Sequence, residues 1–105
     1  GLTAMAEIAT TPRTKPKAKA TRPPLYKVIL LNDDFTPRDF VVKVLKRIFR
    51  MTEGEAMGVM MTAHRRGACV VAVYTREVAE TKAQQATELG REAGYPLAFT
   101  TEREE

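Results

Sequence analysis

Two short polar stretches contain the residues of this sequence that could do chemistry. The first is Asn32-Asp33-Asp34, and the second contains His64, the only histidine in the chain. An Asp and a His can form an acid–base pair, while carboxylates at Asp33, Asp34 and Asp39 would suit a hard metal ion. Asn and Asp side chains also simply stabilise turns. The chain has no glycine-rich phosphate loop, no Cys or His ligand spacing and no serine elbow motif.

The same polar residues would also suit the capture of an ammonium group. A carboxylate supplies charge, and an amide oxygen and a neutral imidazole nitrogen each accept a hydrogen bond. These acceptors match the three protons of a free amine, and no nucleophile accompanies them. Met60 and Ala63 closely precede His64, so an apolar pocket is expected beside the polar cluster. Val41 would border that pocket from another helix. An amine beside an apolar cavity describes a peptide N-terminus with a large apolar first side chain.

The polar triplet lies in a tight turn between a predicted strand and a predicted helix. Val28–Leu31 is a continuous apolar run, which is typical of a buried strand. Thr36 and Pro37 form the pattern of an N-cap followed by proline at the first helical position. The apolar spacing then predicts a helix from Pro37 to Phe49. Rigid elements on both sides would hold the turn in place, and Asp34 is the residue expected to stabilise the turn itself.

The remaining elements complete a small mixed fold. A capping box at Thr52–Glu55 begins a second helix, which is predicted to end at Gly67. A strand at Ala68–Tyr74 is expected to be central because it is apolar on both faces. A helix over 76–93 and a strand over 97–101 follow. The order β-α-α-β-α-β predicts an α+β two-layer sandwich: a three-stranded antiparallel sheet with helices packed on one face.

Charge divides the chain into two parts. Its 105 residues carry a net charge of +4 and fit one small domain. Residues 1–24 contain five basic residues and one acidic residue, whereas 25–105 contain twelve of each. We therefore expect a flexible, basic, proline-rich arm over 1–24, a folded core over 25–101 and a frayed acidic tail over 102–105. Residues 1–4 are expected to be a cloning remnant before a native start at Met5.

Composition argues against several classes of protein. No apolar run approaches the roughly 20 residues that span a bilayer, and the N-terminus lacks a signal-peptide pattern. The single cysteine, Cys69, cannot form an internal disulfide and fits a reducing cytosol. Because it lies in a strand-like run, we expect a buried, inert thiol. The basic arm leaves open a solubilising tail or contact with a partner or nucleic acid.

Four stretches resemble the Clp protease adaptor ClpS family. They are Tyr26–Pro37, which contains Leu-Asn-Asp-Asp-Phe-Thr-Pro, then Met60–His64, Glu77–Lys82 and Tyr95–Leu97. The resemblance implies a bacterial, cytoplasmic, monomeric adaptor that is not an enzyme and needs no cofactor or metal. Such an adaptor binds N-degron substrates that begin with Leu, Phe, Tyr or Trp. It delivers them to the ClpA or ClpC unfoldase for degradation by ClpP.

The resemblance also implies roles for individual residues. Binding of the substrate's α-amino group and first peptide unit falls to Asn32, Asp33 and His64. The side-chain pocket would be bordered by Thr36, Arg38, Val41, Met60, Ala63 and Leu97. Docking on the N-domain of the unfoldase falls to Glu77 and Lys82, at the exposed start of the third helix. The basic arm matches a flexible N-terminal extension implicated in hand-over to the unfoldase.

Two pocket positions depart from the usual pattern of the family. Arg38 replaces a common methionine, and Ala63 replaces a larger aliphatic residue. These changes suggest a divergent second copy with narrower specificity. The alternative function is an RNA- or ribosome-associated binding protein that acts through the basic arm, although the resemblance itself predicts neither nucleic acid nor membrane as a partner.

Overall fold

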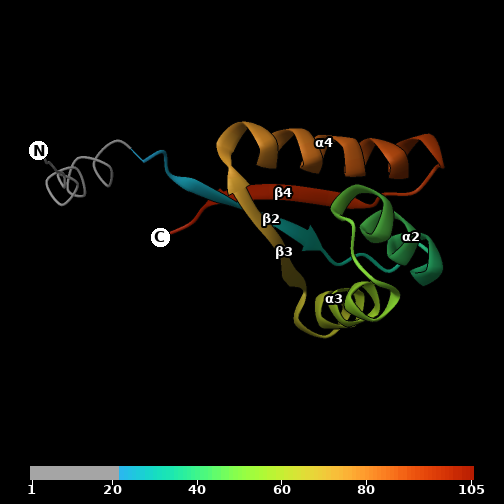
Figure 1. Cartoon of the computed structure of the whole chain (residues 1–105). Coiled ribbons are helices and arrows are strands. Elements are labelled where there is room, and N and C mark those ends of the chain that lie inside the picture. The colour runs from blue at the N-terminus through green and yellow to red at the C-terminus, as the bar shows by residue number, and fades with distance from the viewer. Residues whose placement is uncertain (1–21) are drawn as a thin grey trace, which may run out of the picture.

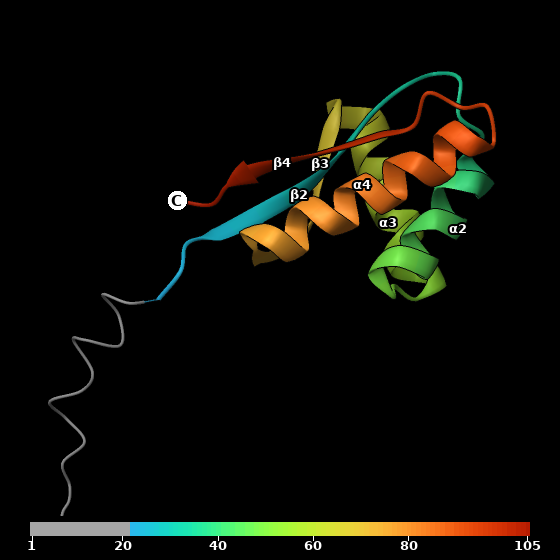
Figure 2. The same ribbon diagram turned by 90° about the horizontal axis from the view of Figure 1, so that it is seen from above.

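The computed structural model describes residues 22–105 as three strands and three helices in the predicted order. They are β2 (Leu25–Leu31), α2 (Arg38–Phe49), α3 (Glu53–Arg66), β3 (Ala68–Thr75), α4 (Arg76–Glu92) and β4 (Ala98–Arg103). The strands form one antiparallel sheet, and the helices pack on the same side of it (Figures 1 and 2). The predicted α+β fold class is thus confirmed. Most of the predicted arm, residues 1–21, lies outside the described residues.

The central strand of the sheet is β2, because the strand order is β3-β2-β4. The prediction that Ala68–Tyr74 is central is therefore wrong. On the side away from the helices, Val70 and Val73 of β3 are 47% and 38% exposed. The apolar run of β3 thus reflects valines on an open face of the sheet rather than burial on both sides. In β2, by contrast, every second residue is buried at its C-terminal half, where Val28 and Leu30 point into the core.

The helix boundaries follow the predicted signals with one exception. At α3 the capping box is present: Thr52 Oγ1 accepts from the Glu55 N–H (3.1 Å), and Glu55 Oε1 accepts from the Thr52 N–H (2.9 Å). The same helix ends at Gly67, whose φ of 91° favours glycine. The prediction of Thr36 as the N-cap of α2 is wrong, since Pro37 occupies that position. The Thr36 hydroxyl is used elsewhere, as described below.

The C-terminal segment is more ordered than the sequence suggested. β4 begins one residue later than predicted and continues to Arg103, so the expected fraying at Glu102 is wrong. Lys27 on the neighbouring strand lies 3.5 Å from the Glu102 carboxylate, and the Glu104 N–H donates to the Leu25 carbonyl at 2.8 Å. These contacts extend the pairing of β4 with β2 to the N-terminal end of β2.

Close packing of α4 on the sheet fixes the position of Leu97, which precedes β4. The stripe of small residues on α4 is buried at Ala79, Ala83, Ala86 and Gly90. A Cβ atom at Gly90 would lie 2.7 Å from Leu97 Cβ, so only glycine allows this approach. The buried stripe ends at Gly90, because the next small residue, Ala93, is exposed. Leu97 itself is buried and reaches the site described next.

Candidate functional site

A cavity of about 300 Å³ opens where the end of β2 meets α2 and α3. This end of the sheet lies away from the C-terminus (Figure 1). All nine residues predicted for the amine site and the side-chain pocket line this cavity: Asn32, Asp33, Thr36, Arg38, Val41, Met60, Ala63, His64 and Leu97. Four separate parts of the chain contribute them, so the fold brings together residues up to 65 positions apart.

The floor of the cavity is apolar and the mouth is polar. Val41 from α2, Met60 and Ala63 from α3, and Leu97 before β4 are all buried. The mouth carries Asn32, Asp33, Asp34 and His64, of which Asp33 alone is half-buried and the others are exposed. A ligand with a polar, cationic end and an apolar side chain would match both parts.

The cavity also includes residues that the sequence analysis did not assign to it. They are Leu30, Leu31, Asp34, Phe35 and Pro37. Leu30 is buried, whereas Phe35 is 78% exposed and stands at the rim. Their only sequence signal was their position around the polar triplet, which does not reveal which side chains turn toward α3.

The loop that carries the polar triplet is tied to the end of α3. The Asn32 N–H donates to the Gly67 carbonyl at 3.0 Å, and the neighbouring residue Leu31 pairs with Ala68 in the sheet. Gly67 is the C-cap of the helix that carries His64. Backbone contacts therefore hold the loop with Asn32 next to the end of the helix that carries His64.

Asp33, rather than Asp34, stabilises the turn. Its Oδ1 accepts from the N–H groups of Phe35 (2.8 Å) and Thr36 (2.7 Å). Its Oδ2 accepts from the Thr36 hydroxyl at 2.9 Å. The exposed Asp34 carboxylate accepts no hydrogen bond from the part of the chain that the structure describes. The expectation that Asp34 holds the turn is thus wrong, because the carboxylate of Asp33 does so.

Arg38 occupies the mouth of the cavity in this structure. Its Nη2 lies 3.3 Å from His64 Nε2, and its Nη1 lies 3.9 Å from Met61 Sδ. A guanidinium can only donate, so a hydrogen bond here uses Nε2 as the acceptor, which is the role of this nitrogen in one of the two imidazole tautomers. In that tautomer Arg38 engages the single acceptor of the His64 ring. Any other donor at Nε2 would have to displace this guanidinium.

The competing chemical interpretations find little support at the site. Within residues 22–105, no group of three His, Cys, Asp or Glu side chains is placed to hold a metal ion, which argues against a centre at Asp33, Asp34 and Asp39. Cys69 is half-buried, and burial raises the pKa of its thiol, which disfavours the reactive thiolate. Among the described helices, none is long and apolar enough to cross a bilayer.

The two residues expected to dock on an unfoldase lie on α4, outside the cavity. Glu77 is exposed in the first turn. Lys82 is only partly exposed, because its Nζ donates to the Ile48 carbonyl at 3.1 Å and lies 5.7 Å from the centre of the Tyr74 ring. The expectation that both are exposed is wrong for Lys82. Its ammonium stabilises the C-terminal end of α2.

Comparison with known proteins identifies the family. The family model of the ATP-dependent Clp protease adaptor protein ClpS matches residues 21–100, and the chain belongs to this family. Members of the family are adaptors and not enzymes. A relative from Mesorhizobium japonicum, ATP-dependent Clp protease adapter protein ClpS 2, is 64% identical over 96% of this chain and 100% of its own length. ClpS 1 of Bradyrhizobium diazoefficiens is 62% identical with the same coverage.

A solved structure gives the same result in three dimensions. Agrobacterium tumefaciens ClpS2, bound to L-phenylalaninamide, is 65% identical and superposes with a TM-score of 0.78. The match covers 79% of this chain and all of the other. L-Phenylalaninamide carries a free α-amino group, an aromatic side chain and an amide in place of a peptide bond. The family, and the resemblance to a second ClpS copy, are thus confirmed.

The contacts of Asp33 lead to a prediction about stability. Asp33→Ala should lower the free energy of unfolding by about 1–3 kcal/mol, because two backbone N–H groups and a hydroxyl lose their acceptor. Asp34→Ala should change it by less than about 0.5 kcal/mol, as expected for an exposed side chain without partners. Urea unfolding of both variants measures the difference. Equal losses would contradict the assignment of the turn to Asp33.

Proposed function

We propose that this protein is a cytoplasmic adaptor that captures polypeptides through a free N-terminal amine and a bulky apolar first side chain. The first residues expected are Leu, Phe, Tyr and Trp. The adaptor then delivers these substrates to the ClpA or ClpC unfoldase for degradation by ClpP. One observation carries the proposal: a single cavity joins an acceptor-rich mouth at Asn32, Asp33 and His64 to a buried apolar floor. The phenylalaninamide bound by A. tumefaciens ClpS2 has both of the matching chemical groups.

The amine would be held by Asn32, His64 and the two aspartates. Three hydrogen bonds already engage the Asp33 carboxylate and leave it one of its roughly four acceptor sites, on Oδ2, for a ligand. Asp34 lines the same cavity with its acceptor sites free of partners among residues 22–105. We therefore add Asp34 to the amine site as a second carboxylate, whose free oxygens can accept hydrogen bonds from the ammonium group of the ligand.

The first side chain would enter the apolar part of the cavity. Its walls are formed by Thr36, Val41, Met60, Ala63 and Leu97, with Arg38 at the rim. Burial of an aromatic or leucine side chain there would contribute about 1.5–3 kcal/mol. Ala63 has a small side chain, which leaves this part of the wall open to a large first residue.

The α-amino group provides the direct test of this proposal. A fluorescent peptide that begins with Phe should lose about 2–5 kcal/mol of binding free energy when its amine is acetylated, because a charged, hydrogen-bonded contact disappears. Fluorescence anisotropy measures both affinities. A peptide that begins with Gly is the control for the side-chain pocket and should also bind weakly. Equal binding of free and acetylated Phe peptides would falsify the amine site.

Arg38 would compete with the substrate for His64. Its guanidinium engages the only acceptor that a neutral imidazole offers, so ligand binding requires Arg38 to move. Arg38→Met should therefore raise the affinity for a Leu peptide, which offers the displaced guanidinium no ring face, about fivefold, the equivalent of one net hydrogen bond of roughly 1 kcal/mol. Anisotropy titrations measure this change. Arg65→Met is the matched control, because Arg65 is exposed on α3 and does not line the cavity. Weaker binding by Arg38→Met would mean that Arg38 instead closes over the bound ligand.

The exposed start of α4 would dock on the unfoldase N-domain. Glu77 supplies a charge there, and the adjacent Val78 supplies an exposed apolar contact. Lys82 would contribute through its partly exposed ammonium, although its bond to the Ile48 carbonyl makes any substitution a change in stability as well.

Glu77 therefore gives the cleaner test of docking. Glu77→Lys should weaken binding to the isolated unfoldase N-domain about five- to tenfold, as expected for reversal of an interface charge. Glu92→Lys makes the same change of charge at the other end of α4 and should have little effect. Isothermal calorimetry measures docking, while peptide affinity should stay unchanged in both variants. Unimpaired docking by Glu77→Lys would remove this face from the interface.

A further inference from the structure

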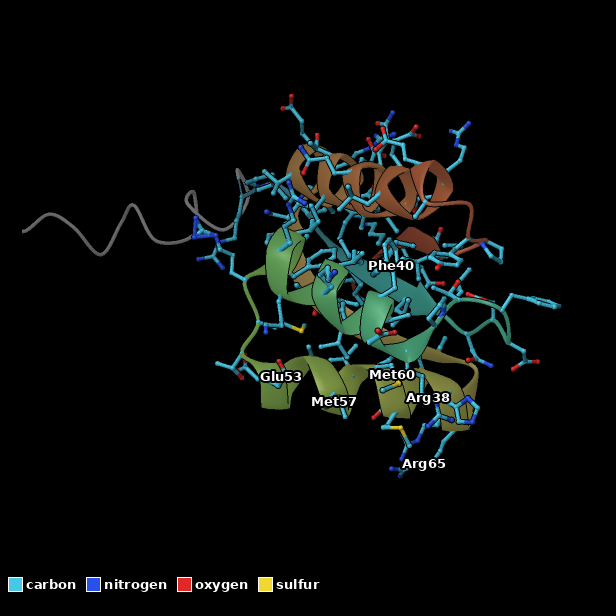
Figure 3. All side chains as sticks on the ribbon, turned by 90° about the vertical axis from the view of Figure 1, so that its right-hand side faces the viewer. Arg38, Phe40, Glu53, Met57, Met60 and Arg65 are labelled. Atoms are coloured by element: carbon cyan, nitrogen blue, oxygen red, sulfur yellow. The ribbon has the colours of Figure 1, made fainter. Side chains whose placement is uncertain are left out.

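A second, larger groove lies between α2 and α3. It has a volume of about 700 Å³, and its apolar lining comes from Val42, Met57, Met60 and Met61. Figure 3 looks onto this face, with Met57 and Met60 lying between Glu53 at one end and Arg38 at the other. Met57 is 43% exposed, whereas Met60, one turn further along the same helix, is only 5% exposed. The methionines of α3 are therefore only partly used to fill the core.

The groove is continuous with the cavity at the end of β2. Arg38 and Met60 line both of them. The guanidinium of Arg38 lies on the boundary, because one nitrogen contacts His64 on the cavity side and the other contacts Met61 on the groove side. Displacement of Arg38 by a ligand would thus open a path from the cavity into the groove.

The charges around the groove are predominantly basic and incompletely paired. Lys46 pairs with Glu53 across the two helices at 2.7 Å. Among the described residues, the ion pairs leave the rim residues Arg38, Lys43 and Arg47 without an acidic partner, against a single unpaired rim carboxylate at Asp39. An occupant that complements this rim carries negative charge.

We propose that this groove binds the residues that follow the first residue of the substrate, as an extended segment that combines apolar and acidic side chains. From Arg38 to Arg47 the rim follows α2 for about 13 Å, at roughly 1.5 Å of rise per residue. An extended peptide covers about 3.3 Å per residue, so about four residues fit along it. Methionine side chains adapt their shape and would accept varied apolar groups. The inference rests on the proposed capture of an N-terminal residue.

Peptides that differ only after the second residue test the proposal. Three fluorescent peptides begin with Phe-Ala and carry Glu, Gly or Lys at positions three to five. The Glu peptide should bind about three- to tenfold more tightly than the Lys peptide, since each exposed charge pair contributes only modestly. The difference should shrink in 0.5 M salt, where the Debye length falls to about 4 Å.

Two groups of variants assign the effect to the groove. Lys43→Glu and Arg47→Glu should abolish the preference for the Glu peptide, whereas Arg91→Glu, the same charge change on α4, should preserve it. Met57→Ala should weaken binding of all three peptides about two- to fivefold through lost apolar burial. Val70→Ala is the matched control, because Val70 is exposed by 47% on the open face of the sheet, away from the helices.

The outcomes separate this inference from the proposed function. If the acetylated Phe peptides bind as well as the free ones, the amine site and the groove proposal fail together. If free-amine peptides bind better but positions three to five and Met57 have no effect, only the groove proposal is overturned. Concentration-dependent self-association that Met57→Ala removes would assign the groove to a second copy of the chain, which also overturns the proposal.

Discussion

The three hydrogen bonds accepted by the Asp33 carboxylate determine how the chain passes from β2 into α2. Two of their donors are backbone N–H groups of Phe35 and Thr36, which no regular element satisfies, and the third is the Thr36 hydroxyl. A buried or half-buried turn needs such a substitute for secondary structure, because unpaired polar groups are costly. Together with the bond from Asn32 to Gly67, this carboxylate fixes the position of the loop relative to both helices that form the cavity.

Local sequence signals predicted those parts of the structure that depend on local contacts. The capping box at Thr52, the end of α3 at Gly67 and the order of elements all follow from residues a few positions apart. The order of the strands in the sheet does not follow from local signals. An apolar strand such as β3 can lie at the edge of a sheet and place its valines on the open face. The course of β4 beyond Thr101 depends on its partner β2, which a local pattern does not reveal.

The candidate site shows the same division. The polar triplet, His64 and the apolar floor were predictable as a set, and the fold brings every predicted pocket residue to one cavity. The different roles of Asp33 and Asp34 could not be predicted, because two adjacent aspartates in a turn have the same local sequence pattern. The contact of Arg38 with His64 spans 26 positions along the chain and two helices. Such a contact depends on how α2 and α3 pack, which no spacing of residues specifies.

Arg38 links the chemistry of the site to the surface around it. A methionine at this position would add apolar wall to the cavity and nothing else, whereas arginine brings a donor that engages the His64 acceptor. The cost of displacing that donor applies to every ligand equally, so it cannot by itself distinguish one first residue from another. Selectivity arises only if the released guanidinium interacts differently with different ligands. An aromatic first side chain offers it a ring face, and an acidic residue further along offers it a carboxylate. Ligands with neither feature incur the displacement cost without compensation. Arg38 would thus narrow the range of substrates through the contacts that it gains after moving, and not through the space that it occupies.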